Sequence, residues 1–147
     1  MRELDRLLGV EAVSRVYECE AVDAPGTPDF LNAAVLVRTL LPPARLKHRI
    51  LRPLETRLGR VRVEDSHAPR TIDIDIAVIG GLRIDDPETG LSVPDPGIAR
   101  LAHLAFPLRD IAPLLVLPGV GVTLAELARR LEPGCGIRLR EDLDLSP

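Results

Sequence analysis

The feature that most constrains the fold of this chain is the alternation of apolar and acidic residues in Thr71–Ile79, which reads Thr-Ile-Asp-Ile-Asp-Ile-Ala-Val-Ile. Successive side chains of a β-strand point to opposite faces of a sheet. One face, which must lie on the core, therefore carries Ile72, Ile74, Ile76 and Val78, whereas Asp73 and Asp75 share the other face. We expect this segment to be the clearest strand of the fold.

Asp73 and Asp75 repel each other when both are ionised, and burying either one without a partner is costly. A divalent cation removes both problems, and Mg²⁺ is commonly held by one or two carboxylates together with substrate phosphates. Arg60, Arg62 and Arg70 flank the pair, and guanidinium groups suit a bound triphosphate. The same arginines could instead form salt bridges with the aspartates. A solvated sheet face is a third interpretation.

The rest of the chain predicts a single α+β domain over residues 1–147, because apolar periodicity and turn residues separate helices from strands. We expect helices around Leu4–Leu8, from Pro42 to Leu58, at Ile98–Leu104 and at Thr123–Leu131, strands at Ala12–Val22, Phe30–Thr39, Leu82–Ile84 and Gly136–Arg140, and a loop at Gly90–Gly97. Pro53 should kink the second helix, since proline removes a backbone donor. This order suggests helices packed on a largely antiparallel sheet.

Composition excludes several classes of protein. Hydrophobic residues make up 46% and charged residues 28%, which is typical of a globular chain, and the net charge of −3 gives no reason to expect binding to nucleic acid or to a membrane surface. Cys19 and Cys135 do not form a disulfide framework, so a reducing, cytoplasmic location is the simple expectation. We do not expect the histidines to bind metal.

Phe30 and Asn32 lie two residues apart in an expected strand, so both should face the same way. A flat aromatic side chain beside a carboxamide can stack on a heteroaromatic ring and hydrogen-bond to its edge. A phenylalanine in a strand is, however, more often a core residue.

Taken together and in this order, several motifs resemble the 6-hydroxymethyl-7,8-dihydropterin pyrophosphokinase family of folate biosynthesis. They are Asp29–Ala34 (Asp-Phe-Leu-Asn-Ala-Ala), Glu55–Arg62 (Glu, then Gly-Arg-Val-Arg), Pro69–Ile76 (Pro-Arg-Thr-Ile-Asp-Ile-Asp-Ile), Val93-Pro94, and Pro107–Pro113. The similarity extends from about Val10 to the end of the last expected helix.

The resemblance implies a ferredoxin-like α+β sandwich and a transferase reaction. The hydroxymethyl oxygen of the pterin would attack the β-phosphorus of ATP, the co-substrate, and AMP would be released. Two Mg²⁺ ions would be held between ATP and the pterin by Asp73 and Asp75. Association with other folate-pathway enzymes is a possible further property of such a chain.

The resemblance also implies roles for particular side chains. Phe30 would stack on the pterin, with Asn32 bonding to its edge and His103 on its other side. Arg60 and Arg70 would be catalytic, together with Asp73 and Asp75, and would touch the phosphates or the moving loop. The residues expected to bind ATP are Glu55, Arg62 and Arg100.

The first departure from the family is at the N-terminus, because members usually open with an interior strand ahead of the first helix and this sequence starts at that helix. Without it, neighbouring strands would carry unpaired backbone groups. A start further upstream, the tail Ile137–Leu143 or a partner chain could supply the strand. We favour the upstream start as a hypothesis.

Further departures affect the site. The family's histidine after Val93-Pro94 is Asp95, a phosphate-binding arginine aligns with Leu101, and the Arg-Trp of the mobile loop is Ser66-His67. These changes motivate an alternative: a catalytically weakened relative that binds nucleotide or pterin as a regulatory or assembly module. A different phosphoryl- or nucleotidyl-transfer enzyme that uses the same aspartate pair is a third possibility.

Overall fold

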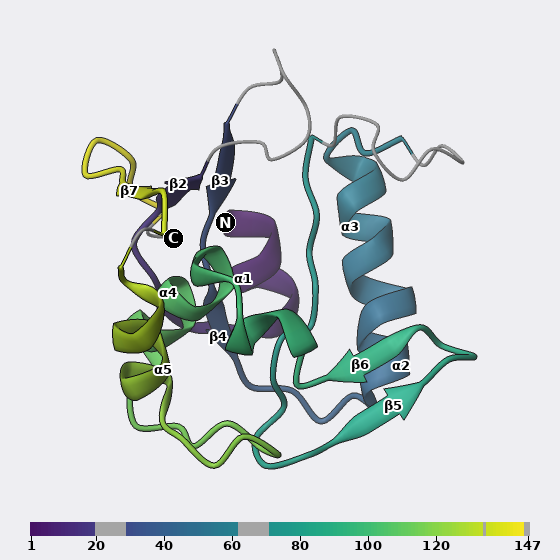
Figure 1. The fold of residues 1–147 in the computed structure, drawn as a ribbon. Coiled ribbons are helices and arrows are strands. Elements are labelled where there is room, and N and C mark those ends of the chain that lie inside the picture. Colours follow the sequence, from purple (N-terminus) through teal and green to yellow (C-terminus); the bar gives the residue numbers. More distant parts are fainter. Residues whose placement is uncertain (20–28, 62–70, 134, 146–147) are drawn as a thin grey trace.

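The computed structural model describes residues 1–19, 29–61, 71–133 and 135–145, and it shows an α+β fold with short antiparallel sheets. Its elements are the helices α1 (Arg2–Leu8), α2 (Pro43–Arg45), α3 (Arg52–Arg57), α4 (Ala102–Ile111) and α5 (Leu124–Leu131), and the strands β1 (Val10–Val13), β2 (Tyr17–Cys19), β3 (Phe30–Asn32), β4 (Val35–Val37), β5 (Ile84–Asp86), β6 (Leu91–Val93) and β7 (Ile137–Leu139). Figure 1 shows β2, β3, β7, α4 and α5 on one side of the molecule, with α3 and the β5–β6 hairpin on the other. None of the helices in the described ranges combines the length and apolar character needed to cross a membrane.

The strands expected at Ala12–Val22 and Phe30–Thr39 are each interrupted in the middle. β1 pairs antiparallel with β4, whereas β2 pairs antiparallel with β3 and β7. At the interruption, the Ser14 amide donates to the Ala34 carbonyl, and the Ala34 amide donates to Ser14 Oγ at 2.8 Å. The serine hydroxyl takes the place of a backbone acceptor, so the regular ladder ends there. Residues 20–22 of the first expected strand lie outside the described residues.

The long helix expected in the first half of the chain runs without a break from Pro43 to Arg57, because a π-helical stretch η1 (Leu46–Leu51) joins α2 to α3. At its end the Arg52 amide donates to the carbonyl of Lys47, five residues back. Proline has no amide hydrogen, and its ring clashes with the carbonyl one turn earlier. The wide π turn directly before Pro53 relieves both constraints. The irregularity that was expected as a kink is therefore observed as a change from α-helical to π-helical hydrogen bonding.

Thr71–Ile79 is extended but forms no ladder with any strand in the described part of the chain, so the expectation that it is the clearest strand is wrong. A strand is defined by a hydrogen-bonded neighbour, and the described strands pair with one another instead. The alternation itself is retained. Ile74 and Ile76 pack against leucines of α1 and the long helix, while Asp73 and Asp75 line a pocket.

The segment after Thr71–Ile79 differs from expectation in its strands. The return strand is β5, two residues later than predicted, and it pairs with β6 rather than with Thr71–Ile79. β6 lies inside the predicted loop Gly90–Gly97, with Leu91 and Val93 buried and the residue between them exposed. Pro94 and Pro96 made the segment look like a loop, so the alternation of buried and exposed residues in Leu91–Val93 was not recognised as a strand.

The C-terminal half is mostly as expected. The helix predicted at Ile98–Leu104 is a 3₁₀ turn, η2 (Pro96–Ala99), followed by α4, which continues to Ile111. α5 begins where predicted, because Thr123 accepts the Glu126 amide while the Glu126 side chain accepts the Thr123 amide, forming a capping box. β7 pairs with β2. β7 lies at one edge of the β3–β2–β7 sheet, and all three suggestions for the origin of the family's opening strand stay predictions.

The buried apolar side chains of the described residues form three clusters. Tyr17, Phe106 and Ala128 join β2 to α4 and α5. Four leucines, Leu4, Leu46, Leu51 and Leu54, join α1 to the long helix. Ile98, Leu117, Leu124 and Leu127 pack between η2 and α5. Burying a large aliphatic side chain contributes about 1.5–3 kcal/mol, so these clusters supply most of the stabilisation.

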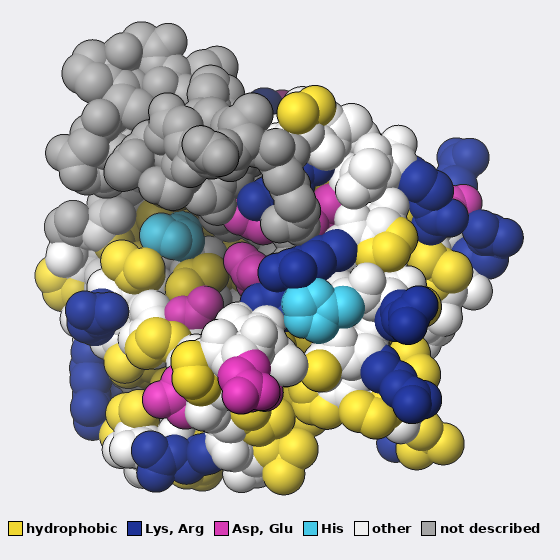
Figure 2. All heavy atoms as spheres, turned by 90° about the vertical axis from the view of Figure 1, so that its right-hand side faces the viewer, with side chains coloured by type: hydrophobic (Ala, Val, Ile, Leu, Met, Phe, Trp, Pro, Cys, Tyr) yellow, Lys and Arg dark blue, Asp and Glu magenta, His cyan; other side chains and the backbone are white. Residues whose placement is uncertain are grey.

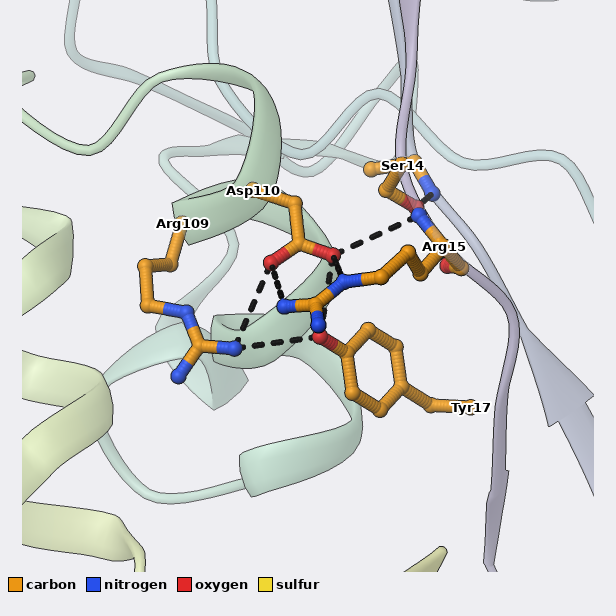
Figure 3. Close-up of polar contacts among 6 residues, drawn as sticks. Ser14, Arg15, Tyr17, Arg109 and Asp110 are labelled. Atoms are coloured by element: carbon orange, nitrogen blue, oxygen red, sulfur yellow. Dashed lines mark hydrogen bonds and ion pairs between the residues drawn. The ribbon is translucent and has the colours of Figure 1, made fainter. Parts of the chain in front are cut away.

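A polar cluster ties α4 to the segment between β1 and β2, and Figure 3 shows its members pointing toward one another. The Arg15 guanidinium donates to both carboxylate oxygens of Asp110 at 2.8 and 3.0 Å, and Tyr17 Oη donates to Asp110 Oδ2 at 2.9 Å. Arg109 Nη2 donates to Tyr17 Oη at 3.0 Å. Burial would raise the pKa of Asp110, but the hydrogen bonds from Arg15 and Tyr17 outweigh it and hold that pKa below its usual range. We call this the Asp110 cluster.

Candidate active site

Asp73 and Asp75 lie in a small pocket of about 210 Å³, which we call the charged pocket. Its lining consists of Lys47, Arg52, Glu55, Arg60, Asp73, Ile74 and Asp75. Figure 2 shows the side of the molecule that lies on the right in Figure 1, and acidic, basic and histidine side chains gather in the middle of that face. The long helix contributes the first three of these residues, and the extended segment contributes the last three. The two carboxylates predicted to act together are therefore on one side of the segment.

Glu55 fixes the extended segment against the end of α3. The residue is 2% exposed, and its Oε1 accepts the Ile74 amide at 2.8 Å. Because Ile74 stands between the two aspartates, this bond sets the position of both. Glu55 was predicted to bind ATP. Its described contacts hold the pocket in shape, and a contact with ATP stays a prediction.

Arg60 is surrounded by acceptors from the same elements. Its Nη1 lies 2.5 Å from Asp73 Oδ1 and 3.4 Å from Glu55 Oε1, and it donates to the Ile72 carbonyl at 2.7 Å. The salt-bridge interpretation therefore holds for Asp73. The predicted contact of Arg60 with phosphate is untested, and this guanidinium is largely committed to the protein.

Asp75 is in a different situation from Asp73. In the described part of the chain, no side chain or amide donates a hydrogen bond to its carboxylate. Burial raises the pKa of Asp75, the negative charges of Asp73 and Asp95 raise it further, and the charges of Lys47 and Arg60 act in the opposite direction. The folded protein thus disfavours the ionised form of Asp75, and a cation beside it would reverse that preference.

The chemistry of the pocket fits magnesium bound together with a nucleotide. The described residues contain no group of three or more acidic, histidine or cysteine side chains that could hold a metal ion by themselves. The protein offers the carboxylates of Asp73 and Asp75, and a phosphate chain and water would complete the coordination, which is the usual arrangement for Mg²⁺. An all-protein metal site is not present in the described ranges.

Asp73 and Asp75 also border a larger cavity of about 2240 Å³, the central cavity. Phe30, Asn32 and His103, the residues predicted to hold a pterin, line it as well. The structure therefore brings the predicted metal ligands and the predicted ring-binding residues to one continuous space.

The three predicted ring-binding residues present suitable groups to the central cavity. Phe30 is 44% exposed, which is unusual for a core phenylalanine. The Asn32 amide nitrogen donates to Cys19 Sγ and to the Phe30 carbonyl, both at 3.2 Å, so the amide oxygen is left to accept from a ligand. Burial lowers the pKa of His103, partly offset by the charge of Asp95, which favours the neutral form of its flat ring.

The remaining predicted residues are placed less closely. Arg100 is exposed, and both Arg100 and the half-buried Asp95 line the central cavity. Asp95 accepts the Gly97 amide at 2.7 Å and so caps η2. Arg62 and Arg70 lie outside the described residues, together with Ser66-His67.

Lys47 and Arg52 were not expected in this pocket. They are five residues apart, which in an α-helix places them about 140° apart around the axis. The one sequence feature that could have indicated their proximity is Pro53, because a proline disturbs the helix before it. The π turn that brings Lys47 and Arg52 to the same side was not predicted.

Comparison with known proteins agrees with this geometry. The family model described as 7,8-dihydro-6-hydroxymethylpterin-pyrophosphokinase (HPPK) matches residues 1–113. The chain belongs to the HPPK family. Its observed α+β fold with antiparallel sheets is consistent with that membership.

Three HPPK relatives show the extent of the similarity. A 2-amino-4-hydroxy-6-hydroxymethyldihydropteridine pyrophosphokinase of Synechocystis sp. is 32% identical over 123 residues, which are 84% of this chain and 60% of the relative. The protein of the same name from Methylorubrum extorquens is 39% identical over 104 residues, 71% of this chain and 62% of the relative. Folic acid synthesis protein fol1 of Pneumocystis carinii is 36% identical over 118 residues, 80% of this chain and 15% of the relative. The chain thus spans about three fifths of the bacterial relatives' length.

Proposed function

We propose that this HPPK-family chain transfers a diphosphate from ATP to the hydroxymethyl group of 6-hydroxymethyl-7,8-dihydropterin, giving the pterin diphosphate and AMP. The observation that carries the proposal is the position of Asp73 and Asp75, which line both the charged pocket and the central cavity. A phosphate chain in the first space and a ring in the second would meet at the aspartates.

In this proposal the protein works by positioning and by charge. Phe30 and His103 hold the flat ring, and Asn32 accepts a hydrogen bond from its edge. Glu55 keeps the aspartates in place through the Ile74 amide. Magnesium, as two ions when bound, supplies neutralisation of the phosphate charge. The hydroxymethyl oxygen bonds to the β-phosphorus, the bond between that phosphorus and the α-phosphate oxygen breaks, and AMP leaves; no covalent enzyme intermediate is required.

The cellular setting is also a proposal. A cytoplasmic enzyme that uses ATP and a reduced pterin fits the free cysteines Cys19 and Cys135 and the composition of the chain. Association with other enzymes of folate synthesis is supported by much longer relatives, such as folic acid synthesis protein fol1 of Pneumocystis carinii.

The test is AMP release from ATP, measured by chromatography with Mg²⁺ and with or without the pterin alcohol. We expect AMP to appear only when the pterin is present, together with one pterin diphosphate per AMP. A folded protein that binds a magnesium nucleotide but releases no AMP would contradict the proposal and would support a regulatory binding module. AMP release with other acceptors only would support a different transferase.

A further inference from the structure

The π turn in the long helix places two cationic residues in the charged pocket. Where backbone hydrogen bonds join residues five apart, those residues stack one turn above the other on the same side of the helix. The Arg52 amide makes this bond to the Lys47 carbonyl. Both side chains consequently line the charged pocket opposite Asp73 and Asp75.

Lys47 is held at the rim of the pocket by the turn of the β5–β6 hairpin. Its Nζ donates to the Gly90 carbonyl at 2.6 Å. An ammonium group has three donors, so this bond leaves two for another acceptor. The charge of Lys47 reaches into the pocket, because it acts on Asp75.

Arg52 is exposed at the pocket and, in the ranges that the structure describes, no acceptor receives a hydrogen bond from its guanidinium. Arg60, by contrast, already faces Asp73, Glu55 and the Ile72 carbonyl. Lys47 and Arg52 are therefore the described pocket cations that make no hydrogen bond or ion pair with a carboxylate of the pocket, and both have donors to offer to an anion.

An anion entering this pocket faces four nearby carboxylates. Glu55, Asp73 and Asp75 line the pocket, and Asp95 is close enough to act on Asp75. A phosphate chain carrying several negative charges needs cations on its other side as well as a metal ion, and Lys and Arg are the side chains that bind phosphate.

We propose that Lys47 and Arg52 form a phosphate-binding pair that contacts the polyphosphate chain of the nucleotide opposite Asp73 and Asp75. This inference rests on the proposed function, because it assigns the ATP phosphates to the charged pocket. It adds two residues of the long helix to the binding site.

The experiment compares binding to the full chain by calorimetry. The variants are Lys47→Met, Arg52→Met and the double variant, in which methionine keeps an apolar stem without the charge. Arg49→Met is the matched control, since Arg49 is exposed on the same helix and lines neither space. The probes, both with Mg²⁺, are α,β-methylene ATP and inorganic tripolyphosphate.

We expect each single variant to raise the Kd of both probes about tenfold, the effect of losing a charged hydrogen bond, and the double variant to raise it further. Arg49→Met should leave both values within about twofold, and Lys47→Arg should restore most of the binding lost in Lys47→Met. A Kd in the double variant equal to that of Arg49→Met would overturn the proposal. If the double variant does not fold, Arg52→Met decides, since its side chain has no described contact to lose.

The tripolyphosphate arm separates this inference from the proposed function. Loss of tripolyphosphate binding in the variants, in a protein that releases no AMP, would leave the cation pair standing and the transferase reaction refuted. If the wild type releases AMP but the variants bind both probes as tightly as the wild type, the transferase reaction stands and the cation pair is refuted.

Discussion

The Asp110 cluster and the charged pocket both combine aspartates with basic residues, but the pKa of the central aspartate shifts in opposite directions. In the cluster, Asp110 is 10% exposed and accepts hydrogen bonds from Arg15, Tyr17 and Arg109. In the pocket, Asp73 shares Arg60 with Glu55. Asp75 receives no hydrogen bond from the described residues. The carboxylate of Asp110 thus accepts several hydrogen bonds, whereas the carboxylate of Asp75 accepts none from the described residues.

The pKa values follow this difference. Donors hold the pKa of Asp110 below its usual range in spite of burial, whereas burial and neighbouring carboxylates raise the pKa of Asp75. Ionised Asp110 therefore stabilises the fold, and ionised Asp75 destabilises it. Carboxylates with a raised pKa are often found at functional sites, where a ligand compensates for the unfavourable charge, and this difference favours the charged pocket as the functional site.

The largest expected effect is on turnover. Asp75→Asn should lower AMP release by more than about a hundredfold, because loss of a residue that merely supports a metal ligand already costs 10–100-fold. The protein should stay folded by circular dichroism. A variant that unfolds, or one that keeps more than a tenth of the activity, would show that Asp75 is a structural residue like Asp110.

Asp110→Asn should act on stability instead. We expect the free energy of unfolding to fall by about 1–3 kcal/mol, the usual cost of leaving buried donors unsatisfied, when measured by urea denaturation. Glu11→Gln is the control, because Glu11 pairs with an exposed Arg38 and should change stability by less than about 1 kcal/mol. Equal effects of the two variants would contradict the role given to the cluster.

The pH dependence of Asp110→Asn sharpens the comparison. A lowered pKa in the folded state means that Asp110 contributes its stability fully above its ordinary pKa of about 4 and loses it as the pH falls through the folded value. The gap in unfolding free energy between wild type and variant should therefore be full at pH 7 and shrink below about pH 4. A gap that is constant from pH 7 to pH 3 would show that the charge of Asp110 is not what stabilises.

Tyr17→Phe should have the smallest effect. Its hydroxyl connects Arg109 to Asp110, and removing one neutral hydrogen-bonding group costs about 1 kcal/mol. The ring keeps its edge-on packing against Phe106, so the core cluster is retained. AMP release per folded molecule should not change; a loss of more than threefold would connect the cluster to the active site.

The sequence and the structure agree where local chemistry decides. The alternation of Thr71–Ile79 predicted that Asp73 and Asp75 share a side, and the helix expected at Thr123–Leu131 begins at its predicted residue, where the structure shows a capping box. Long-range pairing was not predictable in this way. Thr71–Ile79 has strand propensity but no described ladder, since a ladder depends on which strand comes to lie beside it.

The site shows the same limit. Phe30, Asn32 and His103 all line the central cavity, and each lies in a strand or helix of the expected type, but their binding to a pterin stays a prediction. Lys47 and Arg52 were not predicted to lie together, because α-helical periodicity places them on different sides of the helix. The π turn brings them to the same side. Arg62 and Arg70 lie outside the described residues, and their roles stay predictions.

The most direct test of the account is the unfolding temperature of wild type and Asp75→Asn at pH 7, each measured without ligand and with Mg²⁺ and α,β-methylene ATP. Without ligand, the variant should unfold at the higher temperature, because it lacks the unfavourable charge. With ligand, the order should reverse, since only the wild type gains the full stabilisation from binding. A variant that is less stable than the wild type without ligand, or a wild type that gains nothing from the magnesium nucleotide, would contradict the assignment of Asp75 to a metal–nucleotide site.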